Sequence, residues 1–326
     1  MSDFGSTDVL YIGEASTPKV KPGEVLVRVK AAALNRADLL QRRGMYPPPK
    51  GASEILGLEM AGDIVELGEG VTGLSVGDRV CSLLPGGGYA QYAVIPEGMA
   101  MKLPDTLSFE EGAAIPEAFL TAYLNLFVVG GLAPGKTVLV HAGASGVGTS
   151  AIQLIREAGA TSIITAGSAK KIECCLSLGA KAGWNYHQGD FLPFVKEQTN
   201  GSGVDLILDF VGEPYFEQNI NSLSVDGRLV IVGTMGGVDV KSLNLVYLLK
   251  NRLQILGTAL RSRSVSDKIQ LTQALMTFAG SHFAARRILP VIDSVFDWKD
   301  VAIAHERMES NQNTGKIVLR IGGIPD

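Results

Sequence analysis

The sequence predicts an α/β protein in two parts, a β-barrel-like domain and a doubly wound parallel sheet. Three observations predict this fold class. Short β-like runs broken by glycine and proline fill the region up to about residue 110. Strands and helices alternate from about residue 120 to 260, and a glycine-rich turn lies among them at Thr137 to Ser150. The chain has 326 residues, 46% of them hydrophobic, which is enough to fill two ordinary cores.

The first part is predicted to form a small barrel. Residues 24–33 alternate apolar and polar side chains as a strand does. Residues 63–67 and 78–83 are the clearest strand candidates that follow. The turns between these runs are marked by glycines, at Gly68, Gly70, Gly73 and Gly77.

The middle of the chain is predicted to be doubly wound. An apolar stripe at helical spacing follows the turn, formed by Ile152, Leu154, Ile155 and Ala158. Residues 162–166 are the next β-rich run, so this region reads as a βαβ unit. Two more such runs, 204–209 and 228–233, continue the alternation and predict a parallel sheet.

The tail returns to other patterns and is expected to fold back onto the first domain. Helices are predicted near residues 266–280 and 301–309. Between them lies an apolar run, 288–292, and after them a strand, 316–319.

The turn has the chemistry of a pyrophosphate site. Backbone N–H groups at a helix N-terminus are unpaired and lie at the positive end of the helix dipole. Gly143, Gly146 and Gly148 keep side chains away from those groups. Ser145 stands where a G-x-G-x-x-G motif has its second glycine, so a tight turn without a ligand is the alternative reading.

The residues after the second strand favour NADPH over NADH. An Asp or Glu there would bind a ribose 2′-OH, but no acidic residue lies between Glu157 and Glu173. Ser168, Lys170 and Lys171 instead offer a hydroxyl and two ammonium groups for a 2′-phosphate. The alternative is that both lysines belong to a solvated first helical turn.

Charge and cysteine content limit the function classes. A net charge of −4 and dispersed basic residues argue against nucleic acid as a partner. Cys81, Cys174 and Cys175 cannot build a disulfide framework, so we expect a reducing, cytoplasmic compartment. Residues 1–5 lack the features of a signal peptide, and the longest uncharged stretch, 118–135, reads as a buried helix and loop rather than a membrane span.

With these features in hand, the chain resembles the zinc-independent quinone oxidoreductases of the medium-chain dehydrogenase/reductase superfamily. Within them it is most similar to the p53-inducible quinone oxidoreductase branch of the zeta-crystallin-like group. The resemblance covers nearly the whole chain. Besides the turn, it rests on residues 33–38, 44–49, 83–90, 114–118, 166–168, 260–263 and 315–318.

The resemblance implies a catalytic GroES-like domain of residues 1–119 and 264–326 and an NADPH-binding Rossmann domain of residues 120–263. It also implies a homodimer. Relatives open with an apolar strand, whereas Met1 to Asp8 are short and polar here. The first edge strand of the barrel is therefore expected to be missing or altered.

The residues also predict that no metal is bound. Zinc-dependent relatives carry Gly-His-Glu, and this chain has Leu58 in place of that histidine. It has no cysteine near Asn35 to Asp38, and residues 83–88 replace the four-cysteine lobe of those relatives. The histidines are scattered without metal-ligand spacing, at His141, His187, His282 and His305. His141 ends a buried strand and is read as structural.

By resemblance, Asn35 and Tyr46 are the catalytic candidates, at the nicotinamide end of the cofactor. An amide and a phenol there could hydrogen-bond a quinone oxygen or the cofactor ribose. Asn35 can equally be a helix N-cap, and both roles can hold together. Tyr46 precedes Pro47 to Pro49, which stiffen the loop as a pocket wall or a rigid connector.

The same resemblance assigns residues to the cofactor. Ser145, Gly146 and Val147 would hold the pyrophosphate, Ser168 and Lys171 the 2′-phosphate, and Tyr186 the adenosine. Gly233 and Met235 would follow a parallel strand at its C-terminal end, where ligands bind in such sheets. Two tail residues, Arg261 and Lys316, would close the cleft, the alternative being surface charges in salt bridges.

The implied reaction is the reduction of a quinone by NADPH to a hydroquinone or a semiquinone, by transfer of hydride or of single electrons, since a quinone is reduced without a metal to polarise it. One alternative is an NADPH-dependent reductase of activated alkenes such as 2-alkenals and enones. Another is a crystallin-like or RNA-binding protein that retains the NADPH site.

Overall fold

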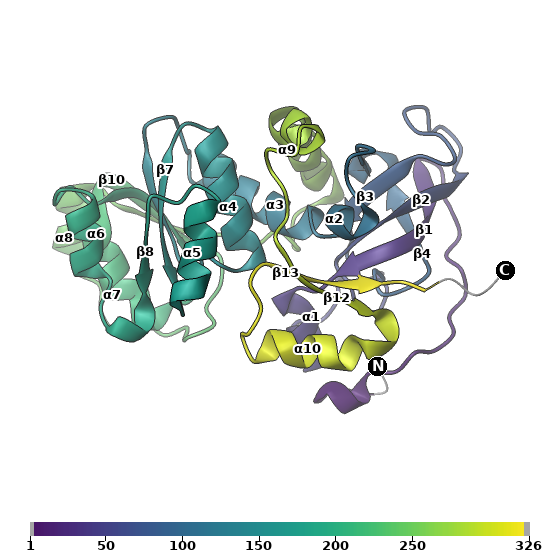
Figure 1. The fold of residues 1–326 in the computed structure, drawn as a ribbon, viewed down its shortest axis with the longest axis horizontal. Coiled ribbons are helices and arrows are strands. Elements are labelled where there is room, and N and C mark those ends of the chain that lie inside the picture. Colours follow the sequence, from purple (N-terminus) through teal and green to yellow (C-terminus); the bar gives the residue numbers. More distant parts are fainter. Residues whose placement is uncertain (1–2, 323–326) are drawn as a thin grey trace. The chain divides into compact units, whose positions relative to one another are not determined.

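The computed structural model describes residues 3–322 (Figure 1). The chain divides into two compact units. Unit 1 comprises Met1–Leu120 and Arg261–Asp326, and unit 2 comprises Thr121–Leu260. No helix of the described residues is long and apolar enough to cross a membrane.

Unit 1 is built on a sheet that has seven strands within residues 3–322. Its order is β12-β13-β1-β2-β3-β5, with β4 also paired to β1, and only β12 and β13 run parallel. The strands are β1 (Glu24–Ala33), β2 (Glu59–Leu67), β3 (Arg79–Leu83), β4 (Tyr92–Pro96), β5 (Met101–Lys102), β12 (Ile292–Asp297) and β13 (Lys316–Arg320).

The tail completes this sheet, because Ala32 of β1 pairs with Leu319 of β13. This confirms that the tail folds back onto the first part of the chain. The apolar run 288–292 leads into β12, which begins at Ile292, and Ile288 is buried. Before β1, the described residues 3–23 hold one short helix and no strand.

Unit 1 also contains helices, some of which pack on this sheet. They are η1 (Thr7–Val9), α1 (Arg36–Arg42), η2 (Glu97–Met99), α2 (Phe109–Ala113), α3 (Pro116–Tyr123), which continues into unit 2, α9 (Val265–Ala284), η5 (Trp298–Asp300) and α10 (Val301–Glu309). The core joins the strands to α10, since Val27, Met60 and Ile317 lie in one cluster with Ala304 and Met308. Burying such side chains supplies the main stabilisation of the unit, about 1.5–3 kcal/mol for each large one.

Unit 2 is built on a parallel sheet that has six strands within residues 3–322, in the order β11-β10-β9-β6-β7-β8. The strands are β6 (Thr137–Val140), β7 (Thr161–Ala166), β8 (Ala182–Asn185), β9 (Val204–Asp209), β10 (Leu223–Ile231) and β11 (Gln254–Gly257). The order reverses between β6 and β9, which is the doubly wound topology that the sequence predicts. Ligands of such sheets bind beyond the carboxyl ends of the strands at that reversal.

The helices of unit 2 pack on this sheet (Figure 1). They are the π-helix η3 (Leu124–Val129), α4 (Gly146–Glu157), α5 (Ala169–Ser177), η4 (Tyr186–Gln188), α6 (Leu192–Gln198), α7 (Glu213–Ser222) and α8 (Leu245–Asn251). One core cluster joins Leu139, Ile163 and Ile207 of the strands to Val195 and Ile220 of α6 and α7. The two-part fold with a GroES-like and a Rossmann-like sheet is therefore confirmed.

Candidate functional site

The glycine-rich turn of unit 2 joins β6 to α4. The Ser145 hydroxyl caps α4 by accepting the Gly148 N–H at 3.0 Å. The N–H groups of Gly146 and Val147 lie in the first turn, before the intrahelical bonding begins. Ser145, Gly146 and Val147 are half-buried, so this turn presents donors at the positive end of a 12-residue helix.

Two glycines of the turn have no room for a side chain. A Cβ on Gly148 would lie 2.4 Å from the Ala142 carbonyl oxygen and 2.6 Å from that of Gly143. A Cβ on Gly143 would lie 2.7 Å from the Ile164 side chain. Ala142 takes the left-handed backbone conformation, with φ at 48°, which is rare for a residue other than glycine. The turn is thus a compact backbone cradle, and an anion such as a pyrophosphate fits its exposed donors.

The candidates for the 2′-phosphate and the adenosine lie together at the ends of β7 and β8. Ser168 caps α5 and accepts the Lys171 N–H at 3.3 Å. Lys170 is exposed and Lys171 half-buried in the first turn of that helix. The Tyr186 hydroxyl lies over Gly167, where a Cβ would approach it to 2.4 Å. Gly167 therefore allows the Tyr186 ring to reach the end of β7.

Gly233 and Met235 follow β10. The Gly233 N–H donates to the Asp209 carbonyl oxygen at 3.2 Å and the Met235 N–H to that of Phe210, also at 3.2 Å. The Met235 side chain is 60% exposed. This loop thus lies beyond the carboxyl end of the strand, which is where the sequence expectation placed it.

A buried polar chain crosses the carboxyl ends of the central strands, and sequence reasoning found only its histidine. The two His141 ring nitrogens lie 2.9 Å from Thr165 Oγ1 and 2.7 Å from Asn219 Oδ1, and Asn219 Nδ2 donates to Asp209 Oδ2 at 3.1 Å. Burial lowers the pKa of His141 to about 4 and raises that of Asp209 to about 6. His141 is therefore neutral at pH 7, and its partners fix the ring behind the turn. An aspartate that ends an apolar strand was the available signal for Asp209.

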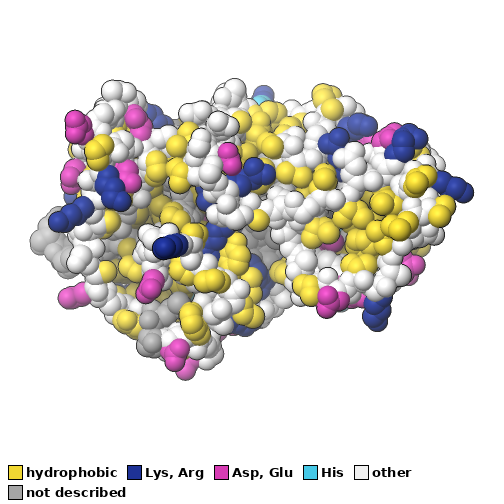
Figure 2. Space-filling view, turned by 180° about the vertical axis from the view of Figure 1, so that it is seen from behind, with side chains coloured by type: hydrophobic (Ala, Val, Ile, Leu, Met, Phe, Trp, Pro, Cys, Tyr) yellow, Lys and Arg dark blue, Asp and Glu magenta, His cyan; other side chains and the backbone are white. Residues whose placement is uncertain are grey.

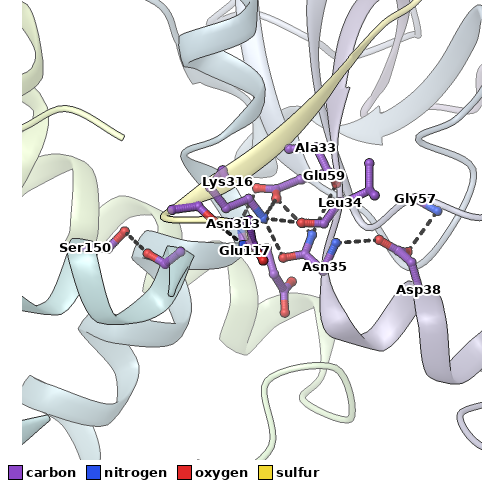
Figure 3. A network of polar contacts seen from close by, with 12 residues as sticks. Ala33, Leu34, Asn35, Asp38, Gly57, Glu59, Glu117, Ser150, Asn313 and Lys316 are labelled. Carbon is purple, nitrogen blue, oxygen red and sulfur yellow. Dashed lines mark hydrogen bonds and ion pairs between the residues drawn. The ribbon is translucent and has the colours of Figure 1, made fainter. Parts of the chain in front are cut away.

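In unit 1, Asn35 lies in a polar network between β1 and α1 (Figure 3). Asn35 is the N-cap residue of α1, and its backbone N–H donates to the Asp38 carboxylate at 2.8 Å as part of a capping box. The side-chain amide of Asn35 also contacts two residues outside α1. Its Nδ2 donates to Glu59 Oε1 at 2.9 Å, and its Oδ1 accepts from Lys316 Nζ at 2.7 Å.

Lys316 holds this network together. Its ammonium lies 2.6 Å from Glu59 Oε1 and 2.7 Å from both the Leu34 carbonyl oxygen and Asn35 Oδ1. Lys316 is 4% exposed and Glu59 is fully buried, so the pair is internal rather than a surface salt bridge. The structure brings Lys316 to Asn35, and the three donors of its ammonium group are all in use.

Two more carboxyl groups of this region escaped the sequence reasoning. The backbone N–H of Glu117 donates to Glu59 Oε2 at 2.8 Å, at the start of α3. Burial, followed by the nearby Glu59 carboxylate, raises the pKa of Glu117 to about 8. Burial also raises the pKa of Asp38 to about 6. The sequence features that could have identified them are the run Ile115-Pro116-Glu117 for Glu117 and, for Asp38, its place three residues after Asn35.

Tyr46 lies under Arg261, also within unit 1. The guanidinium carbon is 4.6 Å from the centre of the Tyr46 ring. The same group donates to the Tyr46 carbonyl oxygen at 3.2 Å and to Gln41 Oε1 at 2.7 Å. Arg261 thus fixes the loop that carries Tyr46, and the pair lines a cavity of about 610 Å³.

The side chains present do not fit a zinc site. Leu58, which stands where zinc-dependent relatives have histidine, is buried and cannot act as a ligand. His305 is buried beside Arg42 and Tyr89, at 3.3 Å and 3.5 Å. Across residues 3–322, no group of three or more His, Cys, Asp or Glu side chains is arranged to hold a metal ion.

Two family models match the chain. The Alcohol dehydrogenase GroES-like domain matches residues 21–105, and the Zinc-binding dehydrogenase domain matches residues 146–276. The first range lies in unit 1, and the second covers most of unit 2 and part of α9.

Known proteins match over almost the full length. The quinone oxidoreductase of Lama guanicoe is 32% identical over 322 residues, which cover 98% of this chain and 96% of that protein. The synaptic vesicle membrane protein VAT-1 homolog of Rattus norvegicus is 31% identical over 336 residues, covering 98% and 82% respectively. The structure of Escherichia coli quinone oxidoreductase complexed with NADPH is 30% identical and superposes with a TM-score of 0.86, covering 98% of each chain.

The residues of the turn, the topology of the sheets and these likenesses agree. Homologous quinone oxidoreductases bind NADPH, and the donors at the start of α4 suit such a dinucleotide. The chain therefore belongs to the medium-chain dehydrogenase/reductase superfamily, as an oxidoreductase similar to its quinone oxidoreductases and VAT-1 homologues.

Proposed function

We propose that the protein is an NADPH-dependent quinone reductase that works without a metal ion, from the p53-inducible quinone oxidoreductase branch. The Asn35 network carries this proposal. Its donor set is the Asn35 amide, which the fully bonded Lys316 ammonium and the Glu59 carboxylate hold in place, and the carboxyl group of Glu117. Leu58 occupies the position of a zinc ligand in metal-dependent relatives. Such a donor set suits an acceptor that is already electrophilic, as a quinone is, rather than an alcohol.

NADPH is the proposed cofactor. When bound, it supplies the hydride for the reduction. The N–H groups of Gly146 and Val147 and the Ser145 hydroxyl would hold its pyrophosphate. Ser168 and Lys171 would bind the 2′-phosphate, which NADH lacks, and Tyr186 would contact the adenosine. Gly233 and Met235 would flank the cofactor at the end of β10.

The residues of unit 1 would position the substrate and manage its protons. Arg261 stiffens the Tyr46 loop, so that the Tyr46 hydroxyl can donate to a quinone oxygen from a fixed place. Lys316 and Glu59 hold both ends of the Asn35 amide, which makes them positioning residues for Asn35. Glu117, with its pKa raised to about 8, carries a proton at pH 7 and is our candidate for its delivery to the reduced quinone.

We also propose a homodimer formed through unit 2. Large apolar side chains are exposed on α8 and the loop before it, with Leu245 67%, Leu249 75% and Val238 71% exposed. Figure 2 shows hydrophobic side chains gathered on the face of this unit that it displays. Next to α8, β11 is an edge strand of the sheet. An apolar patch beside an open edge is typical of an interface. Light scattering should give twice the chain mass, and Leu249→Glu should give monomers.

A substrate panel tests the proposed function. The rate of NADPH oxidation is measured with ortho- and para-quinones and with 2-alkenals and enones, for the wild-type protein and for Tyr46→Phe. We expect the higher kcat/KM with the quinones. In Tyr46→Phe, kcat/KM for the quinones should fall about tenfold, which corresponds to the loss of one hydrogen bond. Higher kcat/KM with the alkenals would make the protein an alkene reductase instead. If the protein reduced none of these substrates and bound RNA but not NADPH, it would be a binding protein instead.

A further inference from the structure

The cavity beside Tyr46 lies within unit 1 and has a volume of about 610 Å³. This lies inside the range of roughly 300–1,000 Å³ that is usual for small-molecule sites. Its walls come from the loop after Tyr46 and from the segment that leads into α9. Its lining includes Tyr46, Lys50, Arg261, Arg263, Ser264 and Lys268.

The lining carries only positive charge. Lys50, Arg261, Arg263 and Lys268 are basic, and no Asp or Glu is among the lining residues. Burial, together with the charge of Arg261, lowers the pKa of Lys268, while Glu117 acts in the opposite direction. Cations that share a partly buried wall repel one another, and an anion in the cavity would relieve that repulsion.

The cations differ in what they already bind. Arg261 is committed to Gln41 and to the carbonyl oxygens of Tyr46 and Pro85. Lys268 Nζ donates to the Arg261 carbonyl oxygen at 2.8 Å. The Nε atoms of Arg261 and Arg263 are both buried without an acceptor, but the Arg263 side chain, unlike that of Arg261, makes no other hydrogen bond or ion pair within residues 3–322. A buried donor in that state is costly unless a ligand satisfies it.

The start of α9 adds a second contribution. The helix begins at Val265, and the Ser264 hydroxyl caps it by accepting the Asp267 N–H at 3.0 Å. Both Ser264 and Val265 line the cavity. The helix has 20 residues, so the positive end of its dipole lies at the cavity wall beside Arg263.

We propose that this cavity binds an anionic substituent of the substrate, with Arg263 as its main partner. The preferred substrates are then quinones that carry a carboxylate, sulfonate or phosphate group. This inference rests on the proposed quinone reduction and adds the substrate class. The guanidinium fork suits a two-point contact with such a group, and the neighbouring cations would add attraction at longer range.

Paired substrates test the inference. The value of kcat/KM is measured at saturating NADPH with a naphthoquinone and with the same quinone carrying a sulfonate. Because the two quinones differ in intrinsic reactivity, the readout is the ratio of the two values in each variant relative to the wild type. Arg263→Gln should lower the sulfonate-to-neutral ratio about tenfold, the effect of one charged hydrogen bond. Arg263→Lys should retain most of the ratio. Lys299→Gln removes an exposed charge outside the cavity lining and should leave the ratio as it is.

Other results would overturn the inference. One is an unchanged ratio in Arg263→Gln. Another is a raised KM for NADPH with the ratio unchanged, which would assign the cavity to a cofactor phosphate. If neither quinone is reduced, the proposed function fails, but the anion site is still tested by calorimetry with naphthalene sulfonate. Weaker binding by Arg263→Gln than by wild type would support the site, and equal binding or no binding by both would refute it.

Discussion

Replacing Gly148 by alanine tests the cofactor cradle with a single methyl group. That Cβ would lie 2.4 Å from the Ala142 carbonyl oxygen and 2.7 Å from the Gly143 carbonyl carbon. To reach even 3.0 Å from the oxygen, the turn would have to open by about 0.6 Å. The contact atoms belong to the backbone of the turn, so no side chain can move aside to absorb the strain.

The cost follows from two opposing terms. Overpacking of this kind typically costs about 1–3 kcal/mol of folding free energy. Replacing glycine by alanine inside a helix stabilises the folded state by up to about 1 kcal/mol. We therefore expect a folded protein, destabilised by roughly 0–2 kcal/mol, whose first-turn donors are displaced. A displacement of this size should raise the dissociation constant for NADPH at least about tenfold, and for NADH likewise, because both carry the pyrophosphate.

Calorimetric titration with each dinucleotide, alongside urea unfolding, measures both effects. Gly280→Ala is the matched control, since that helical glycine has only the flexible end of Met276 near its Cβ, at 3.4 Å. The control should bind NADPH as the wild type does. A stably folded Gly148→Ala protein with wild-type affinity for NADPH would refute the assignment of this turn to the pyrophosphate.

Three further predictions follow from the charged groups. Lys171→Glu should weaken NADPH binding much more than NADH binding, measured by titration, whereas equal losses would remove Lys171 from the 2′-phosphate site. Glu117→Gln should gain stability over the wild type as pH rises. The pKa of Glu117 is raised from 4.5 to about 8 on folding, so between these values the folded wild type holds the extra proton and its free energy of unfolding falls. The free energy of unfolding of Glu117→Gln relative to the wild type should rise by at most about 1.4 kcal/mol per pH unit. Urea unfolding near pH 4.5 and near pH 8 measures this rise. A difference that does not change with pH would contradict the raised pKa. Lys316→Met should lower the free energy of unfolding by about 3–5 kcal/mol, because Glu59 loses its buried partner. The double variant Lys316→Met with Glu59→Gln should recover part of that stability. Losses that simply add in the double variant would argue against the pairing.

Much of the fold was predictable from local pattern. The strand 24–33, the strand 204–209 and the helix 301–309 match the structure residue for residue, because apolar periodicity and turn residues bound them on both sides. Elements that depend on distant partners were less accurate. Strand β2 begins at Glu59 rather than residue 63, since its first residues are held by pairing with β3. Helix α9 extends four residues past the predicted end at 280.

The candidate sites divide in the same way. Ser145 and Ser168 both cap the helices that follow them, as the strand-turn-helix pattern indicates. The Lys316 ion pair with Glu59 joins residues more than 250 positions apart, and no spacing rule reaches that far. The chain from His141 to Asp209 was missed for the same reason, since its members come from separate strands and a helix.

The most direct test of the proposed function is the cofactor and metal dependence of quinone reduction. The rate of naphthoquinone reduction is measured with NADPH and with NADH, before and after treatment with a metal chelator, on protein whose metal content has been determined. We expect a kcat/KM for NADPH at least about tenfold above that for NADH, which is the contribution of one charged contact to the 2′-phosphate, and a rate that the chelator does not change. A rate lost with the metal, or an equal use of both cofactors, would contradict it.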